Sequence, residues 1–202
     1  MTEVSINKQV KLSEHFTLGE LCKTGVKTAD GNIPSHVHIE NLKRVCEWLE
    51  ELRRRYNQQY VCENEERSVS PPKLGGVRGG LNRGLSGASS DHPSHTGTPP
   101  NSGGEIDTEE PIIISSGYRS QELNKKVGGS PTSNHLTGCA VDIRVYGVEQ
   151  AMRYAVILMD YAEETKQDYD ELLIERNRSG GYWLHFAVRQ KDNRRKTKFL
   201  QK

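Results

Sequence analysis

A carboxylate stands inside an apolar run of the kind that forms buried β-strands. The run is AVDI, residues 140–143, within the longer stretch SNHLTGCAVDIRV. Because strand residues alternate between the two faces of a sheet, Asp142 would face away from its two apolar neighbours. A bare buried carboxylate is costly unless it meets an opposite charge or a metal ion. The run therefore predicts a strand in which Asp142 pairs either with an arginine, Arg119 or Arg144, or with a metal.

The rest of the chain predicts one domain with an insertion. Its 202 residues fit a single domain, and a net charge of +1 creates no overall field for nucleic acid or a membrane surface. Residues 63–110 are rich in Gly, Ser and Pro and have almost no aromatic or branched apolar side chains, which predicts a disordered insertion. His92 and His95 within it are expected to be solvated. The basic run Arg189–Lys202 is expected to be a solvated end.

Neither targeting nor disulfide signals stand out. The N-terminal stretch has no apolar run typical of a signal peptide, and no segment is long enough to cross a membrane. We therefore expect a protein made in the cytoplasm, without a membrane partner. The cysteines form no C-x-x-C pair, so reduced thiols are expected. They are Cys22, Cys46, Cys62 and Cys139.

Helical and strand patterns are mixed outside the insertion. A short helix is expected after Thr17, with Glu20 in capping-box spacing, and a long helix after Ser35. The apolar stripe of the long helix would be Val37, Leu42, Val45, Leu49 and Leu52. Further helices are predicted within 120–129 and 148–167, and strands within 111–120, 138–146, 169–176 and 181–189. Because the last two strands form an antiparallel hairpin, the fold class is predicted to be α+β.

Two histidines can join Asp142 in one site. His135 lies in a polar loop before the Asp142 strand, and His185 lies in the last predicted strand, two residues after Trp183. Across a sheet, His185 and Trp183 could share the face of Asp142. Two imidazoles and one carboxylate form a three-ligand set suited to a catalytic zinc ion. The alternative is that Asp142 pairs with an arginine and His185 is a hydrogen-bonded core histidine.

Four motifs resemble the signature of the zinc D-Ala-D-Ala carboxypeptidase family, which includes peptidoglycan-cleaving phage endolysins with a Hedgehog-like zinc peptidase fold. They are S-G-Y-R-S at 116–120, V-G-G-S at 127–130, S-x-H-x-x-G-x-A-x-D at 133–142 and W-x-H at 183–185. The opening LSEHFTLGEL also resembles the family's short single-domain branch. The resemblance implies one zinc-peptidase domain over 1–202, in which a small antiparallel sheet carries the zinc site and packs with several helices.

The resemblance also implies roles for individual residues. One zinc ion per chain would be held by His135, Asp142 and His185. Arg119 would hold the substrate carbonyl or its oxyanion, or else pair with Asp142 or Glu175 and orient the site.

Further residues are expected around the zinc site. Ser133 would bind the substrate's terminal carboxylate, or else cap its own loop. Tyr118 and Trp183 are expected to contact substrate. Gly138 and Ala140 are small enough to let the backbone pass close to the metal.

The general base departs from a familiar pattern. Many relatives place Glu or His three residues before the last ligand, where this chain has Tyr182, a poor base at neutral pH. We predict Glu175 as the base, because the hairpin can bring it beside His185. Glu171 is the second candidate. The structural alternative for Glu175 is an ion pair with Arg189.

These features together predict a zinc metallopeptidase that hydrolyses amide bonds of peptidoglycan stem peptides or cross-links through a zinc-activated water. The alternative is an inactive zinc-containing cell-wall binding domain or a phage structural domain. A phage enzyme would reach the cell wall through a separate lysis system, whereas a cytoplasmic one would act on recycled peptides. No nucleic-acid partner is expected, and a monomer is favoured.

Overall fold

The computed structural model describes residues 7, 9–61 and 109–201. The predicted insertion therefore lies outside the described residues except for its last two positions, and so do His92, His95 and Cys62. The remaining three cysteines are free. In chain order the elements are α1 (Leu18–Leu21), α2 (His36–Tyr56), a π-helical turn (Asn57–Val61), β1 (Ile114–Ser116), α4 (Gln121–Lys126), a 3-10 helix (Asn134–Thr137), β2 (Ala140–Arg144), α5 (Val148–Thr165), β3 (Glu171–Arg176), β4 (Tyr182–Ala187) and β5 (Lys196–Gln201).

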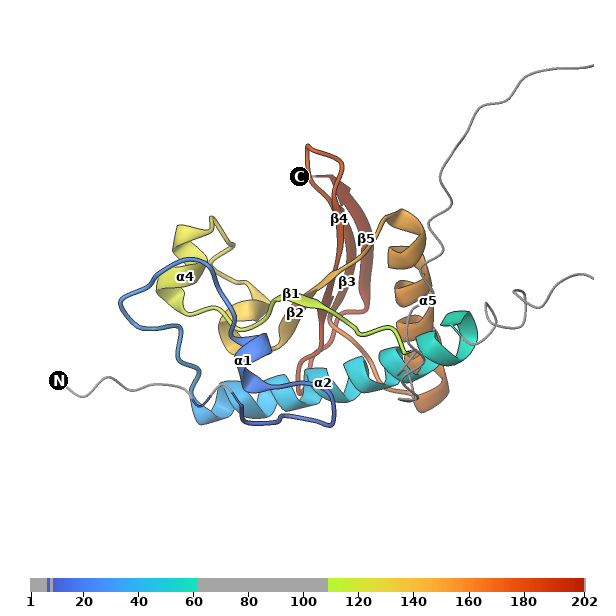
Figure 1. The fold of residues 1–202 in the computed structure, drawn as a ribbon, viewed down its shortest axis with the longest axis horizontal. Coiled ribbons are helices and arrows are strands. Elements are labelled where there is room, and N and C mark those ends of the chain that lie inside the picture. The colour runs from blue at the N-terminus through green and yellow to red at the C-terminus, as the bar shows by residue number, and fades with distance from the viewer. Residues whose placement is uncertain (1–6, 8, 62–108, 202) are drawn as a thin grey trace, which may run out of the picture.

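The strands form one five-stranded sheet in the order β1-β2-β4-β3-β5 (Figure 1). All neighbours are antiparallel except β3 and β5, which run parallel. The α+β class is confirmed, and so is the predicted hairpin of β3 and β4. The expectation of an antiparallel sheet is wrong at one edge, because β5 makes the sheet mixed.

Strand β5 also corrects the expectation that the basic run Arg189–Lys202 is a solvated end. Residues Lys196–Gln201 pair with the full length of β3. Their pattern alternates, with Lys196 and Lys198 on one face and Thr197 and Phe199 on the other. Most of these side chains are exposed, as is common for an edge strand that lysines protect from further pairing.

Helices α2 and α5 pack against one face of the sheet (Figure 1). The opposite face carries mostly polar side chains, together with Leu173 and Trp183. Trp48 of α2 is buried against Phe186 of β4, with ring centroids 5.3 Å apart. The strands contribute Val141, Ile143, Leu172, Leu184 and Phe186 to this core. No helix in the described part of the chain combines the length and apolar character of a membrane span.

The helix starts follow the predicted caps. Thr17 and Glu20 form a complete capping box at α1, and the Ser35 hydroxyl caps α2. The predicted stripe of α2 is buried from Leu42 onward, but Val37 is exposed. The expectation for Val37 is wrong because the first turn of α2 extends beyond the core.

One buried carboxylate ties the C-terminal segment to the sheet. Asp170, directly before β3, accepts hydrogen bonds from Arg194 Nε and Nη2, both at 2.7 Å, and from Asn134 Nδ2 at 2.7 Å. Arg189 Nη2 adds an ion pair at 3.1 Å. The arginines lie between β4 and β5, while Asn134 directly precedes His135. Asp170 therefore fixes both the C-terminal segment and the loop that carries a candidate ligand.

Replacing Asp170 with asparagine should lower the free energy of unfolding by about 2 kcal/mol, because charged donors lose their anionic acceptor. For a chain of this size the melting temperature should fall by about 4–8 °C. Asp168→Asn is the matched control, because exposed Asp168 pairs with Arg195 at 3.4 Å and surface ion pairs contribute little. Equal losses in the two variants would contradict the anchoring role of Asp170.

The contribution of Asp170 should also depend on pH. Burial alone would raise the pKa of this carboxyl group, but hydrogen bonds from Arg194 and Asn134 and nearby arginine charges lower it overall. A carboxyl group with a lowered pKa in the folded state stabilises the fold above its unfolded pKa, and that contribution is lost as the pH falls. The stability difference between wild type and Asp170→Asn should therefore shrink on acidification, which urea unfolding at neutral and acidic pH measures.

Candidate metal centre

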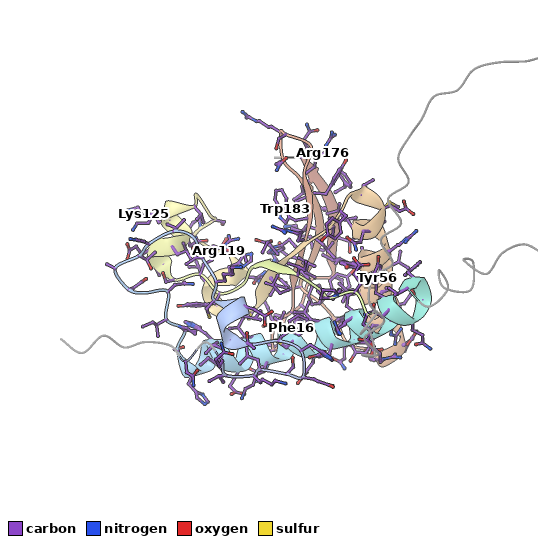
Figure 2. All side chains as sticks on the ribbon, viewed as in Figure 1. Phe16, Tyr56, Arg119, Lys125, Arg176 and Trp183 are labelled. Carbon is purple, nitrogen blue, oxygen red and sulfur yellow. The ribbon has the colours of Figure 1, made fainter. Side chains whose placement is uncertain are left out.

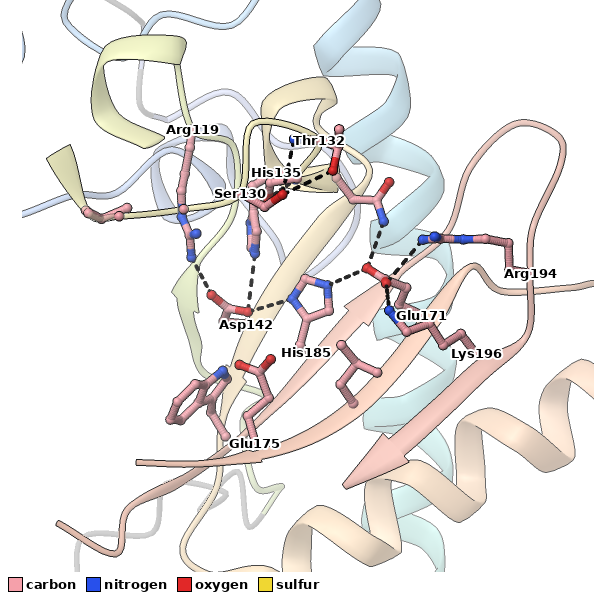
Figure 3. A pocket seen from close by; sticks show the side chains of 17 residues that line it. Arg119, Ser130, Thr132, His135, Asp142, Glu171, Glu175, His185, Arg194 and Lys196 are labelled. Atoms are coloured by element: carbon pink, nitrogen blue, oxygen red, sulfur yellow. Dashed lines mark hydrogen bonds and ion pairs between the residues drawn. The ribbon is translucent and has the colours of Figure 1, made fainter. Parts of the chain in front are cut away.

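Three buried side chains converge on the polar face of the sheet. His135, Asp142 and His185 each present a ligand-type atom, and these atoms lie within 4.8 Å of one another. The strand register explains part of this, because Asp142 of β2 lies directly opposite His185 of β4. His135 comes from the 3-10 helix that precedes β2. The structure thus brings together all three predicted ligands (Figure 3).

His135 has a defined ring orientation. Its Nδ1 lies 2.6 Å from the carbonyl oxygen of Gly117, and its Nε2 lies 3.3 Å from Asp142 Oδ1. A carbonyl oxygen accepts and cannot donate, so Nδ1 must carry the proton. Nε2 is therefore the ring nitrogen that faces Asp142 and that could bind a metal ion.

His185 approaches the same carboxylate oxygen from the other side. Its Nδ1 lies 2.9 Å from Asp142 Oδ1, and its Nε2 lies 3.5 Å from Glu171 Oε2. Burial alone would lower the pKa of His185, but hydrogen bonds to Asp142 and Glu171 raise it to about 9. Without a metal this imidazole therefore carries a proton near neutral pH, which a metal ion would displace.

Asp142 is compensated at both oxygens. Oδ1 faces the two imidazoles, and Oδ2 accepts a hydrogen bond from Arg119 Nη2 at 2.6 Å. Burial alone would raise the pKa of Asp142, but the charges and hydrogen bonds of His135 and His185 lower it well below the ordinary range. The predicted arginine partner and the predicted histidine partners are therefore both present, on different oxygens.

The donor set suits a zinc ion. Two imidazole nitrogens and a carboxylate oxygen match the ligands of catalytic zinc sites, which keep a fourth position open. Metal–ligand bonds of about 2.0–2.1 Å in a tetrahedron place neighbouring ligand atoms roughly 3.3 Å apart. The spacings of 3.3 Å and 2.9 Å from Asp142 Oδ1 to the two rings are close to that value. The chain therefore has a buried His-Asp-His group that could bind a metal ion.

The group lines a cavity of about 660 Å³. Arg119 lies on the α4 side of this cavity and Trp183 on the sheet side (Figure 2). Glu175 is buried, lines the cavity and lies opposite Trp183 across β3 and β4. Tyr182 lies on the other face of β4, where its ring packs on Phe199. Tyr182 is therefore not among the residues that line the cavity, whereas Glu175, the base predicted from the sequence, is.

Ser133 and Tyr118, the other two residues predicted to contact substrate, lie in different surroundings. Ser133 lines the cavity, and its Oγ accepts a hydrogen bond from the backbone N–H of His135 at 3.3 Å, which is the capping role. Tyr118 is buried and stacks on His38, with ring centroids 4.9 Å apart. It borders a second hollow beside the cavity. Arg189, the alternative partner considered for Glu175, contacts Asp170 and Asn134.

A comparison of the sequence with models of known protein families matches the segment that carries two of the three candidate ligands. Residues 105–170 match the family described as Peptidase M15. The resemblance to the zinc D-Ala-D-Ala carboxypeptidase type is confirmed. The matched segment is about a third of the chain and contains His135 and Asp142, whereas His185 and Glu175 lie beyond it. No curated protein matches the chain.

The match supports a metallopeptidase. The fold also brings Glu171, outside the matched segment, next to Asn134 inside it, and Lys196 next to Glu171. Asn134 donates to both Asp170 and Glu171, at 2.7 Å and 3.1 Å. Lys196 Nζ contacts Glu171 at 2.7 Å. Sequence reasoning missed Asn134 and Lys196, and it considered Glu171 only as a base. Because side chains alternate along a strand, Glu171 and Glu175 lie on the same face of β3. This alternation could have predicted from the sequence that both acids face the site.

The M15 motif glycine Gly138 has a role different from the one expected. Its φ of +71° is left-handed, and a Cβ there would lie 2.6 Å from the backbone oxygen of His38 in α2. Position 138 therefore requires glycine because the chain turns here against the backbone of α2. This packing, and not the expected approach of the backbone to a metal, explains the small residue.

Gly138→Ala should destabilise the fold more than Gly128→Ala. Both glycines have nearly equal positive φ values, +71° and +69°, but a Cβ on Gly128 meets nothing within 4 Å. Each variant should lose about 1–2 kcal/mol from the left-handed backbone, and only Gly138→Ala adds the collision. Thermal unfolding of the pair measures the difference. Equal losses would show that contact with α2 does not constrain this turn.

Proposed function

We propose that this chain is a zinc-dependent peptidase that hydrolyses amide bonds in peptidoglycan stem peptides or their cross-links. The observation that carries the proposal is the convergence of His135, Asp142 and His185 beside the cavity that Glu175 and Arg119 line. The M15 match supports the same reaction class. Each of these residues is proposed in the role that the sequence predicted.

One zinc ion held by the three ligands would supply a Lewis acid that polarises the amide and lowers the pKa of a water molecule. Glu175 accepts a proton from the attacking water and transfers it to the leaving amine. Arg119 presents a fixed positive charge to the oxyanion, and its pairing with Asp142 and with Ser116 Oγ, at 2.9 Å, holds the guanidinium in place.

The lining of the cavity supports a short, anionic substrate. Arg119, Arg194 and Lys196 line its walls together with Asp142, Glu171 and Glu175, so a divalent metal would shift the charge balance of the lining toward positive. Trp183 offers an apolar wall and Ser133 a hydroxyl group for substrate. Tyr118 would be reached only by a substrate that extends into the second hollow. Carboxylate-bearing stem peptides fit this charge pattern, whether a phage lysis system or recycling supplies them.

The first test is metal content and product analysis on the full chain. Protein purified without added metal should contain about one zinc per chain, by elemental mass spectrometry. A muropeptide digest and a stem peptide ending in D-Ala-D-Ala should be cleaved, and chelation should abolish cleavage until zinc is restored. Absence of metal, with none taken up on adding zinc, would contradict the proposal.

Glu175→Gln should reduce kcat by about 10²–10⁴-fold, because the amide cannot accept the proton, while zinc content stays at the wild-type level. Glu149→Gln, which changes an exposed glutamate on α5, is the matched control and should retain full activity. A full hydrolytic rate in Glu175→Gln with intact zinc would reject this base.

Zinc binding and muropeptide binding without any cleavage by the wild type would favour the inactive cell-wall binding domain. The tyrosine at position 182 is the feature that keeps this alternative under test. Product analysis by mass spectrometry separates the two functions and also identifies the bond that is cut.

A further inference from the structure

The outer nitrogen of His185 faces a carboxylate. While Nδ1 of His185 faces Asp142, its Nε2 lies 3.5 Å from Glu171 Oε2. Glu171 is two residues before Leu173, the cross-strand partner of His185, and the alternation of β3 turns both side chains to the cavity. Figure 3 shows the Glu171 carboxylate on the opposite side of the His185 ring from Asp142.

Glu171 is itself held at both oxygens. Oε1 pairs with Lys196 Nζ at 2.7 Å and with Arg194 Nη2 at 3.1 Å. Oε2 accepts a hydrogen bond from Asn134 Nδ2 at 3.1 Å and faces the His185 ring. The three donors come from β5, from the segment before it and from the 3-10 helix. Contacts from three separate elements fix the direction of this carboxylate.

We propose that Glu171 is a positioning residue for the metal ligand His185, and that β5 holds Glu171 in place through Lys196. This inference rests on the metal site of the proposed function. A proton on Nε2 directed at Glu171 leaves the lone pair of Nδ1 for the metal. Histidine ligands commonly donate their second N–H to a carboxylate or a backbone carbonyl, which fixes the ring and raises its basicity.

The other histidine shows the same arrangement with a different acceptor. His135 donates Nδ1–H to the Gly117 carbonyl and presents Nε2, whereas His185 presents Nδ1 and directs Nε2 at Glu171. Each of the two imidazoles thus has an acceptor behind it. Asp142 is held in a similar way by a donor, because Arg119 donates a hydrogen bond to its Oδ2.

A positioning role differs from the role of general base, for which Glu171 was the second candidate. Glu171 is surrounded by Lys196, Arg194 and Asn134, so a proton delivered to it would compete with those donors. Glu175, on the same face, lies beside Trp183 at the other end of the strand. The two acids should therefore fail in different ways when each is changed to glutamine.

The test is the zinc dissociation constant of the full chain, measured by competition with a chromophoric chelator. Glutamine has one acceptor oxygen and cannot serve both the Lys196 side and the His185 side, so Glu171→Gln should weaken zinc binding by about 10–100-fold. At saturating zinc its kcat should stay within a few-fold of wild type. Glu175→Gln should show the reverse, with wild-type zinc affinity and reduced kcat.

A spectroscopic measurement reports the ring directly. In the zinc-loaded protein, long-range ¹H–¹⁵N spectra should show His185 protonated at Nε2, with a proton shift typical of a hydrogen bond to a carboxylate. Glu171→Gln should move that proton signal upfield. An unchanged signal would mean that Glu171 does not accept from this ring, and the proposal would be wrong.

Lys196→Met tests the contribution of β5, and it also serves if Glu171→Gln fails to fold. Zinc affinity should fall by a few-fold, and in Glu171→Gln/Lys196→Met the two losses should be less than additive, because Lys196 acts through Glu171. Lys198→Met is the control. Lys198 lies two residues after Lys196 on the same face of β5 and is not among the residues that line the cavity. Equal affinities in the lysine variants and wild type would overturn the role of β5.

Wild-type zinc affinity in a folded Glu171→Gln would overturn the inference and leave the proposed function intact. A wild-type chain that binds no zinc would instead reject the proposed function. Thermal unfolding of each variant establishes that it is folded.

Discussion

Asp142 lies buried with two imidazoles at one carboxylate oxygen and a guanidinium at the other. An isolated carboxylate in this place would be costly, so the arrangement of its partners constrains the surrounding chain. The pairing of β2 with β4 brings His185, the 3-10 helix brings His135, and the turn after β1 brings Arg119. A candidate metal site and an ion pair are often competing explanations for a buried acid, but here the two imidazoles and the guanidinium contact different oxygens.

The residues of the S-G-Y-R-S motif act largely on the surroundings of the candidate ligands. In S-G-Y-R-S, Ser116 holds Arg119 through its hydroxyl, and the Gly117 carbonyl fixes the His135 ring. A side chain on Gly117 would collide with the backbone of Leu21, whose carbonyl would lie 2.2 Å from the new Cβ. The N-terminal segment around α1 is therefore packed directly against the turn that orients one ligand.

Periodicity and caps predicted the elements whose side chains enter the core. The helix after Ser35 and the β3–β4 hairpin have strong local signals, and alternation placed Asp142 and His185 on sheet faces. Local signals do not say that β2 lies beside β4, which is a long-range pairing. Strand β5 was missed because its side chains are mostly exposed and its partner β3 is separated from it by another strand in the chain. The contact of Lys196 with Glu171 therefore had no signal in the sequence.

Glu171 and Glu175 show why surroundings decide what an acid does. Both lie on the cavity face of β3, two residues to either side of Leu173, and composition cannot distinguish them. At one end of the strand, β5 and the segment before it bring Lys196 and Arg194, which fix and stabilise an anion. At the other end of the strand Trp183 lies opposite Glu175. Environments that differ in this way assign different roles to two carboxylates in one site. In the proposed site, the edge strand β5 supplies no ligand but holds Glu171 as the acid that would orient His185, which leaves Glu175 as the proposed base.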